Sequence, residues 1–391
     1  MKKKIAILGS TGSIGKTLID IIKKDKKNFE ITLLTANKNY KELIKQAKFF
    51  NVKNLIITDF NSFNLAKKIK LGKKINIFNN YENFKKIFKI KNDFIMSSIT
   101  GIDGLKPTLN SIKFTKNILI ANKEALICGW NLIKNELIKN KTKFIPVDSE
   151  HFSIWSLLQN QKEDSIERIY ITASGGPFLN LPKKSFNKIS IKKALQHPSW
   201  NMGKKITIDS STLMNKLFEV IEARNIFNIP YSKISILVHP KSYVHAMVKF
   251  NNGLTKILIH DTSMKVPIFN ALYFKEKDKK LTSKKLDITK LNKLNFTKPD
   301  LKKFPLLDIK KKLPNKISLF ETILISSNDE IVDLFLQKKI NYNDISKFII
   351  KLINSKEFRK YKKISPKNLQ NITELSNFVR LKIKSMVYKS A

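Results

Sequence analysis

Short apolar runs alternate with amphipathic stretches along the chain up to about residue 150. The runs are KIAIL, EITLLT, NLIIT, FIMSS, NILIA and KFIPV, and apolar residues recur at helical spacing from about Ser13 and from Lys41. Such alternation is typical of repeated βα units around a parallel sheet. We therefore predict an α/β domain over residues 1–150.

The pattern then changes. Residues 151–276 mix strands in RIYITAS, SILVHP, HAMVKF and TKILIH with a strong helix over about 211–227, as in an α+β domain. Residues 277–311 are polar and rich in lysine, which suits a linker across the surface. Over residues 312–391 apolar residues return at helical spacing, which predicts a small helical domain.

The chain is strongly basic. The 391 residues carry 75 Lys and Arg against 31 Asp and Glu, a formal net charge of +44. Such a balance ordinarily suggests nucleic acid or an anionic surface as partner. The lysines are spread through nearly every segment, and no nucleic-acid recognition module accompanies them. We interpret the charge as a chain-wide bias, and we expect weak nonspecific binding to polyanions but no specific nucleic-acid partner.

Cysteine usage and the apolar runs bear on the compartment. Cys128 is the single cysteine, which excludes an internal disulfide framework and a cysteine-based zinc site. The start of the chain imitates a signal peptide, but the polar residues 9–11 arrive before an apolar h-region can form. No apolar run approaches the ~20 residues needed to span a bilayer. We expect a cytoplasmic protein without a membrane partner.

The motif GSTGSIG, residues 9–15, lies between the first apolar run and the first predicted helix. Glycines let the backbone approach a pyrophosphate, and the helix N-terminus offers free N–H groups. The spacing is GxxGxxG, so a plain turn is the alternative, but its place at the start of a βαβ unit favours a Rossmann-like dinucleotide site.

The second predicted strand helps to identify the dinucleotide. An NAD site usually has an acid after this strand, and TLLTANKNY has none. Asn37, Lys38 and Asn39 instead supply a cation and amide donors, which fit a 2′-phosphate and hence NADP. Because lysine is common throughout the chain, the missing acid is the stronger half of this inference.

The stretch PVDSEH places Asp148 and Glu150 two residues apart where an apolar run ends. In an extended strand both would project to the same side, so they could serve one cation or form a solvated strand end. Glu219 on the helix over 211–227 would complete three hard oxygen ligands, which Mg²⁺ or Mn²⁺ prefers.

Two further segments can meet an anion. The predicted helix opens with N-cap candidates at residues 209–211 and carries Asn215 and Lys216, although solvated charges on an ordinary helix are the alternative. In TASGGPF, a turn at Ser174 follows a strand and can cradle an anion. HPSWNMGKK, residues 197–205, places apolar side chains in a loop, which indicates either a closing flap or packing against the core.

Six motifs together resemble one family. GSTGSIG, ANKE, PVDSEH, TASGGPF, HPSWNMGKKITIDSSTLMNK and VHPKSYVHAMV occur in the order and approximate spacing of 1-deoxy-D-xylulose 5-phosphate reductoisomerases, over essentially the full length. The resemblance implies an NADPH-dependent enzyme that rearranges 1-deoxy-D-xylulose 5-phosphate and reduces the resulting aldehyde to 2-C-methyl-D-erythritol 4-phosphate, an early step of non-mevalonate isoprenoid synthesis. It also implies Mg²⁺ or Mn²⁺, a homodimer and a C-terminal domain that buttresses the catalytic one.

The resemblance carries roles to particular residues. The implied metal ligands are Asp148, Glu150 and Glu219, which with Lys123 at the reacting centre make up the catalytic set. The implied substrate contacts are Ser149, Glu150, Ser174, His197, Ser210, Asn215, Lys216 and Glu219, with His197 and Trp200 in the closing flap. The implied cofactor contacts are Thr11, Gly12, Ser13, Ile14, Asn37, Lys38, Asn39, Asn122, Glu124 and Gly203.

Some positions depart from the wording of the family. Leu217 replaces a glycine, residues 262–265 read TSMK for PDMR, and Asn37 and Ser156 are also unusual. A branched side chain at Leu217 could crowd the phosphate pocket, so we expect weakened turnover before lost function.

Two other kinds of protein remain as alternatives. One is a semialdehyde dehydrogenase that works through a thioester on Cys128, although a small buried side chain is the simpler role for this residue. The other is a degenerate reductoisomerase kept as a basic binding protein.

Overall fold

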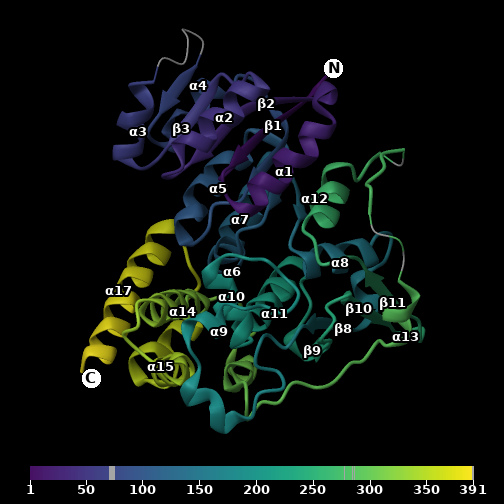
Figure 1. Ribbon diagram of the computed structural model, residues 1–391, viewed down its shortest axis with the longest axis vertical. Helices are drawn as coiled ribbons and strands as arrows, with labels where there is room; N and C mark the ends of the chain where they lie inside the picture. The colour runs from purple at the N-terminus through teal and green to yellow at the C-terminus, as the bar shows by residue number, and fades with distance from the viewer. Residues whose placement is uncertain (70–74, 277, 284, 286, 390–391) are drawn as a thin grey trace. The chain divides into compact units, whose positions relative to one another are not determined.

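The computed structural model describes residues 1–69, 75–276, 278–283, 285 and 287–389 (Figure 1). The chain divides into two compact units. The first comprises residues 1–125, 132–148 and 264–281, and the second comprises 126–131, 149–263 and 282–391. Among the described residues, no helix is both long enough and apolar enough to cross a membrane.

The first unit is built on a seven-stranded sheet in which every neighbouring pair of strands is parallel. The strands are β1 (Lys3–Leu8), β2 (Phe29–Ala36), β3 (Asn54–Ile57), β4 (Asn76–Phe78), β5 (Asn92–Ser97), β6 (Thr115–Ile120) and β7 (Lys143–Pro146). Their order is β4-β3-β2-β1-β5-β6-β7. The strand order therefore reverses at β1, the kind of switch point at which doubly wound folds bind ligands.

Helices α1 to α7 connect these strands, and α12 joins the unit from later in the chain. They are α1 (Ser13–Lys24), α2 (Tyr40–Phe50), α3 (Phe60–Lys67), α4 (Phe84–Ile87), α5 (Leu105–Ile112), α6 (Lys123–Cys128), α7 (Trp130–Asn140) and α12 (Lys265–Leu272). Strands and helices share one apolar cluster, in which Leu8 and Ile95 from the sheet are buried with Phe84 and Phe88. The predicted Rossmann-like α/β fold and all six predicted strands are confirmed. The three-residue β4 was missed because so short a run carries no alternation.

The second unit contains a four-stranded mixed sheet. Its strands are β8 (Ile166–Ala173), β9 (Ile234–Val238), β10 (Val244–Phe250) and β11 (Thr255–Ile259), in the order β11-β10-β8-β9. Strand β10 is antiparallel to both of its neighbours, whereas β8 and β9 are parallel. Helix α8 (Ser149–Leu157) packs on β10 and β11, and α11 (Met214–Phe227) packs on β8 and β9. The predicted α+β character is confirmed.

The same unit holds the helices of the C-terminal part, drawn in yellow-green to yellow in Figure 1. They are α14 (Phe320–Leu336), α15 (Tyr342–Asn354), α16 (Lys356–Arg359) and α17 (Leu369–Tyr388). Helix α14 is buried along most of its length, and it packs against α15, α17 and the earlier helix α10 (Lys204–Ser211). The predicted helical C-terminal region is therefore confirmed, and it joins the unit that carries the four-stranded sheet.

The predicted linker over 277–311 lies partly outside the described residues, at 277, 284 and 286. Its described part contains α13 (Ile288–Asn292), and the 3-10 helix η7 spans Pro305–Lys312. Between them Thr297 pairs with Val238 of β9 through two backbone hydrogen bonds of 2.7 and 3.0 Å. The domain limits at residues 150, 276 and 311 stay predictions.

Candidate active site

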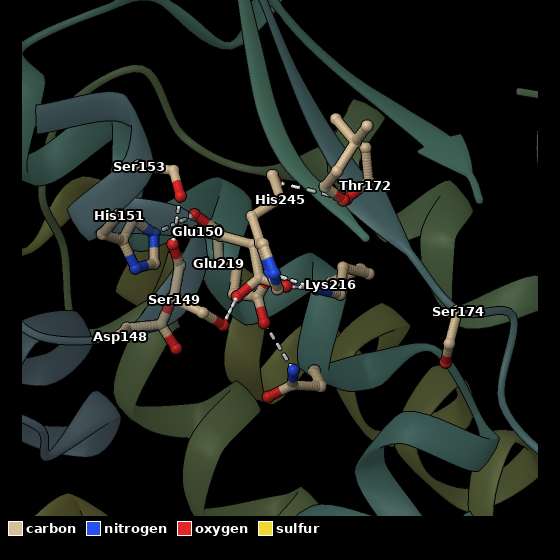
Figure 2. Close-up of polar contacts among 12 residues, drawn as sticks. Asp148, Ser149, Glu150, His151, Ser153, Thr172, Ser174, Lys216, Glu219 and His245 are labelled. Atoms are coloured by element: carbon tan, nitrogen blue, oxygen red, sulfur yellow. Dashed lines mark hydrogen bonds and ion pairs between the residues drawn. The ribbon is translucent and has the colours of Figure 1, made fainter. Parts of the chain in front are cut away.

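Three carboxylates gather where β7 leads into α8. Asp148, Glu150 and Glu219 each offer an oxygen, and these atoms all lie within 4.8 Å of one another (Figure 2). The prediction that Asp148 and Glu150 project from an extended strand is wrong, because β7 ends at Pro146 and α8 begins at Ser149. Glu150 instead stands in the first turn of the helix, and only Ser149 separates it from Asp148 along the chain. The turn into the helix, not strand alternation, brings the two acids together.

Helix α11 adds a buried cation to this group. Lys216 Nζ lies 2.5 Å from Glu150 Oε1 and 2.6 Å from Glu219 Oε2. Burial disfavours the charged form of Lys216, but Glu150 and Glu219 outweigh that effect and hold the pKa of the ammonium above its ordinary value. Asn215 Nδ2 donates to Glu219 Oε1 at 2.5 Å. Glu219 is thus held by both polar side chains of the first turn of α11.

The remaining contacts fix Asp148 and Glu150. Lys123, at the start of α6 after β6, places its Nζ 2.6 Å from Asp148 Oδ2. Ser149 Oγ donates to Glu150 Oε2 at 2.5 Å. In the part of the chain that the structure describes, this is the one group of three His, Cys, Asp or Glu side chains arranged to hold a metal. Because every ligand is a carboxylate oxygen, the group suits a hard divalent cation.

The segment before α11 differs from the prediction. The N-cap interpretation of residues 209–211 is wrong, since these residues form the last turn of α10. The chain reverses at Leu213, whose φ of 59° is left-handed, and α11 starts at Met214. Ser210, at the end of α10, and Lys216, in the first turn of α11, are therefore on two helices that pack against each other.

His197 and Ser174 form a polar pair in the same unit. The backbone N–H groups of Ser199 and Trp200 donate to His197 Nδ1 at 3.1 and 2.9 Å. Nδ1 is thus unprotonated, and in the neutral ring Nε2 carries the hydrogen that points to Ser174 Oγ at 3.1 Å. Burial, aided by the positive charge of Lys216, lowers the pKa of His197 to about 4, which agrees with the neutral form.

Ser174 is consequently left with a hydroxyl hydrogen to offer. Its oxygen accepts from His197 and from the N–H of Gly176, at 3.1 Å in both cases. The two accepted bonds leave the O–H itself as a donor, which is what an anion requires. The predicted turn at Ser174-Gly175-Gly176 is present, with φ of 84° and 66° at its two glycines.

Residues 197–203 run without helix or strand before α10 begins at Lys204, as expected for the HPSWNMGKK loop. The ring of Trp200 meets His245 edge-on, with 6.0 Å between centroids. His245 in turn stacks on His260 at 3.6 Å. Trp200 thus rests on the buried imidazole of His245 in β10, which His260 supports from behind.

The glycine loop of the first unit closes tightly after β1. Gly9 has a φ of +85°, and a Cβ there would lie 2.8 Å from the carbonyl oxygen of Ser98. A Cβ at Gly15 would lie 2.4 Å from the carbonyl oxygen of Gly9. No side chain caps the N-terminus of α1 at Gly12. Loop and helix start, which contain Thr11, Gly12, Ser13 and Ile14, therefore have the form of an anion cradle at the switch point of the sheet.

The other cofactor candidates have structural partners. Asn37 donates to Thr58 Oγ1 at 2.8 Å, and Asn39 caps α2 by accepting from the N–H of Glu42 at 3.3 Å, while Lys38 between them is exposed. Asn122 is buried and donates to the carbonyl oxygens of Ile99 and Gly101. Glu124 is half-buried in α6, and Gly203 belongs to the second unit.

Known proteins resemble this chain in sequence and in fold. Family models match residues 5–129, described as 1-deoxy-D-xylulose 5-phosphate reductoisomerase, and residues 144–227 and 260–382, described as C-terminal domains of that enzyme. The enzyme of that name from Pelagibacter ubique strain HTCC1062 is 60% identical over 386 residues, covering 98% of this chain and 99% of the relative. This chain belongs to the 1-deoxy-D-xylulose 5-phosphate reductoisomerase family.

Solved structures of the reductoisomerase family agree with the fold. The enzyme from Zymomonas mobilis in complex with NADPH superimposes with a TM-score of 0.88 at 32% identity, covering 99% of both chains. A DOX-P reductoisomerase in complex with NADPH, fosmidomycin and magnesium gives a TM-score of 0.90 at 29% identity, covering 99% of this chain and 98% of the other.

Two doubtful positions of this reductoisomerase sequence lie in the interior. Leu217 is fully buried in α11. Consecutive helical residues point about 100° apart, so the side chains of Leu217 and Lys216 leave α11 in different directions. Cys128 is also fully buried, which fits the small-hydrophobe role and not an accessible nucleophile. The expectation that Leu217 weakens turnover stays a prediction.

The sequence suggested no role for two histidines that lie near the site. His151 of α8 is fully buried, and its Nε2 lies 2.9 Å from the carbonyl oxygen of Glu219, tying α8 to α11. His245 supports Trp200, as described above. The sequence did hold a signal, because its five histidines all fall between positions 151 and 260 of a lysine-rich chain.

Proposed function

We propose that this protein is a reductoisomerase that converts 1-deoxy-D-xylulose 5-phosphate to 2-C-methyl-D-erythritol 4-phosphate, using NADPH and Mg²⁺ or Mn²⁺, in non-mevalonate isoprenoid synthesis. The observation that carries the proposal is the convergence of Asp148, Glu150 and Glu219 in a chain of this family. Two relatives of known structure were determined with NADPH, one of them also with magnesium, which supports the same cofactors here.

The metal would be held by Asp148, Glu150 and Glu219. Their all-carboxylate oxygens fit a hard divalent cation, and their three negative charges exceed the charge of the two lysines that pair with them. When bound, such an ion acts as a Lewis acid on the carbonyl and hydroxyl oxygens of the substrate. Lys123 orients Asp148, and Lys216 draws Glu150 and Glu219 together, so the chain presents the carboxylates with their positions set.

NADPH would be held by the glycine loop and by the residues after β2, and it supplies the hydride. The loop fits a pyrophosphate because it is free of side chains where Gly9 meets Ser98 and where Gly15 meets Gly9. Lys38 supplies a cation for the 2′-phosphate, and Asn37 and Asn39 shape the chain around it. Asn122, Glu124 and Gly203 remain proposed contacts.

The phosphate of the substrate would be recognised by Ser174, Ser210, Asn215 and Lys216. Ser174 donates its O–H because His197 and Gly176 occupy its oxygen. Lys216 supplies a buried positive charge from the first turn of α11. Ser149 and the flap residues His197 and Trp200 complete the proposed substrate contacts, and closure of the flap would exclude water from the reacting aldehyde.

We also propose an oligomeric state, a location and domain limits for the enzyme. The family resemblance supports a homodimer in the cytoplasm, a nucleotide-binding domain over 1–150, a catalytic and dimerisation domain over 151–276, a linker over 277–311 and a helical domain over 312–391. The absence of a specific nucleic-acid partner stays a prediction.

The deciding experiment follows NADPH oxidation by absorbance with 1-deoxy-D-xylulose 5-phosphate and Mg²⁺ or Mn²⁺. We expect metal-dependent turnover in the wild type and none in Asp148→Asn, which keeps the shape of the side chain but removes its charge. Asp164→Asn, at an exposed position, is the control and should leave turnover unchanged. A folded wild type that binds NADPH but shows no metal-dependent turnover would overturn the proposal and favour the degenerate binding protein.

A further inference from the structure

The C-terminal helices contact the residues on both sides of Ser210. On one side, Asn328 of α14 donates through Nδ2 to Asp209 Oδ1 at 2.7 Å. On the other, the hydroxyl of Tyr342, at the start of α15, donates to the carbonyl oxygen of Ser211 at 2.7 Å and lies 3.1 Å from Ser211 Oγ. Asn328 and Ser211 are fully buried, and Asp209 and Tyr342 nearly so. The last turn of α10 is therefore fixed from outside at the two residues that flank Ser210.

Tyr342 also reaches the second proposed phosphate segment. Its ring meets that of Phe178 edge-on, with 5.1 Å between centroids. Phe178 ends the TASGGPF segment that begins with Thr172 and carries Ser174. One side chain thus touches the helix end that bears Ser210 and the end of the segment that carries Ser174.

The two segments meet directly as well. A Cβ added at Gly176 would lie 2.8 Å from the carbonyl oxygen of Ser210 and 3.0 Å from Cα of Ser211. The glycine turn and the end of α10 are therefore in backbone contact, with no side chain between them. A small shift of α10 would change the spacing of the hydroxyl groups of Ser174 and Ser210.

A charged network extends the link to α17. Lys205 of α10 pairs with Asp209 and with Asp329 of α14, at 2.9 Å in each case. Arg380 of α17 pairs with the other oxygen of Asp329, also at 2.9 Å. Since Asp209 is nearly fully buried, its charge depends on Lys205 and Asn328 for compensation.

We propose that Tyr342 and Asn328 are positioning residues that set the spacing of Ser174 and Ser210, so that the C-terminal helices control how tightly the phosphate of the substrate is bound. This inference rests on the proposed function for the identity of that phosphate. As positioning residues, Asn328 acts through Asp209, and Tyr342 acts through Ser211 and Phe178.

The test compares Tyr342→Phe with wild type. The change keeps the ring that packs on Phe178 and removes the hydroxyl, so Ser211 loses its external anchor. We expect KM for 1-deoxy-D-xylulose 5-phosphate to rise about 5- to 30-fold, as for loss of one buried hydrogen bond. KM for NADPH should stay within twofold or so, and kcat should change less than KM.

Tyr273→Phe is the matched control. Tyr273 has the same exposed fraction as Tyr342, and its hydroxyl likewise donates a hydrogen bond, to Asp25 at 2.7 Å, but it belongs to the first unit. It should lose stability as Tyr342→Phe does and leave KM for the substrate unchanged. Equal losses of stability with no rise in KM for Tyr342→Phe would show a purely structural role and overturn the inference.

An exchange of side chains tests Asn328. Asn328→Asp places a carboxylate against Asp209 and should raise KM for the substrate. The double variant D209N/N328D exchanges the amide and the carboxylate between the two positions, so the hydrogen bond can form in the opposite direction. It should recover most of the wild-type KM. A double variant no better than Asn328→Asp would argue against positioning by this pair.

Inorganic phosphate separates this inference from the proposed function. Its binding can be titrated by ³¹P NMR in 0.2 M salt without any turnover. Weaker phosphate binding in Tyr342→Phe than in Tyr273→Phe supports positioning even if the wild type proves inactive on 1-deoxy-D-xylulose 5-phosphate. Unchanged phosphate binding together with unchanged KM in an active wild type rejects positioning alone.

Discussion

Lys216 Nζ lies 2.5 Å from Glu150 Oε1, within the interior of the second unit. The same ammonium lies 2.6 Å from Glu219 Oε2, so one cation joins two of the three proposed metal ligands. The residue proposed to bind phosphate therefore also balances the charge of the metal site. Loss of its charge should affect stability, metal binding and substrate binding in distinguishable ways.

Lys216→Met keeps most of the length of the side chain and leaves Glu150 and Glu219 without their shared cation. We expect unfolding free energy without metal to fall by about 3–5 kcal/mol, the usual effect of breaking a buried ion pair. Mn²⁺ should raise the Tm of this variant more than that of wild type, because the ion supplies the missing positive charge. kcat/KM should fall roughly 100-fold, as for loss of a charged contact of about 2–3 kcal/mol.

Lys249→Met is the control for this prediction, since Lys249 pairs with Glu167 at a much more exposed site. Its Tm and its response to Mn²⁺ should match those of wild type. Equal shifts of Tm with Mn²⁺ in wild type and Lys216→Met would contradict the shared role of Lys216.

His197 should remain neutral throughout the physiological range. Its Nδ1 accepts two backbone N–H groups, and burial with the nearby charge of Lys216 lowers its pKa to about 4. In ¹⁵N-labelled protein we expect the Nε2–H tautomer, with no titration of this ring between pH 8 and about pH 5. A midpoint near the ordinary value of 6.5 would be incompatible with the accepted hydrogen bonds, and His197→Asn identifies the signal.

The sequence predicted the strands and the three carboxylates, but it could not predict the break between α10 and α11. Leucine is a good helix former and rarely adopts left-handed backbone, so nothing at Leu213 predicts the reversal that separates Ser210 from Lys216. The residues 209–211 resemble an N-cap by composition, although they end a helix. Tertiary packing of α10 on α11 and α14 decided the outcome, and such packing leaves no local signal.

Polar side chains that can either bind a cofactor or stabilise the fold were equally hard to assign from the sequence. Asn39 and Asn122 fit a cofactor site by position, yet one caps α2 and the other bridges two loop carbonyls. Asp148 and Glu150 were recognised as a pair for the wrong geometric reason, since a helix begins between them. The residue types pointed to the chemistry, whereas the conformation depended on where β7 ends.

Glu321 should make stability depend on pH. It is buried in the first turn of α14, and burial raises its pKa to about 7 from the ordinary 4.5, although Ser318 donates to its carboxylate. The folded state then holds a proton that the unfolded state has already released, so this contribution to stability is complete below about pH 4.5 and is lost as pH rises to about 7.

Glu321→Gln should remove that loss. Relative to wild type, we expect the variant to gain on the order of 3 kcal/mol in unfolding free energy between pH 4.5 and pH 7.5, measured by urea denaturation. Glu374→Gln, at an exposed position of α17, should follow the wild-type curve. A difference between wild type and Glu321→Gln that is independent of pH would show that this carboxyl keeps its ordinary pKa.

Gly176→Ala and Gly253→Ala separate backbone strain from a clash at the phosphate site. Both glycines have positive φ, +66° and +84°, so alanine costs each about 1 kcal/mol or somewhat more in stability. At Gly253 the new Cβ would meet nothing within 4 Å, whereas at Gly176 it would press on the carbonyl oxygen of Ser210 at 2.8 Å. Backbone atoms cannot swing aside as a flexible side chain can, so the end of α10 must move.

We expect both variants to lose stability and Gly176→Ala alone to raise KM for 1-deoxy-D-xylulose 5-phosphate, about tenfold, with KM for NADPH unchanged. Similar kinetics in the two variants would mean that the contact between the glycine turn and Ser210 does not set the spacing of the phosphate-binding hydroxyl groups.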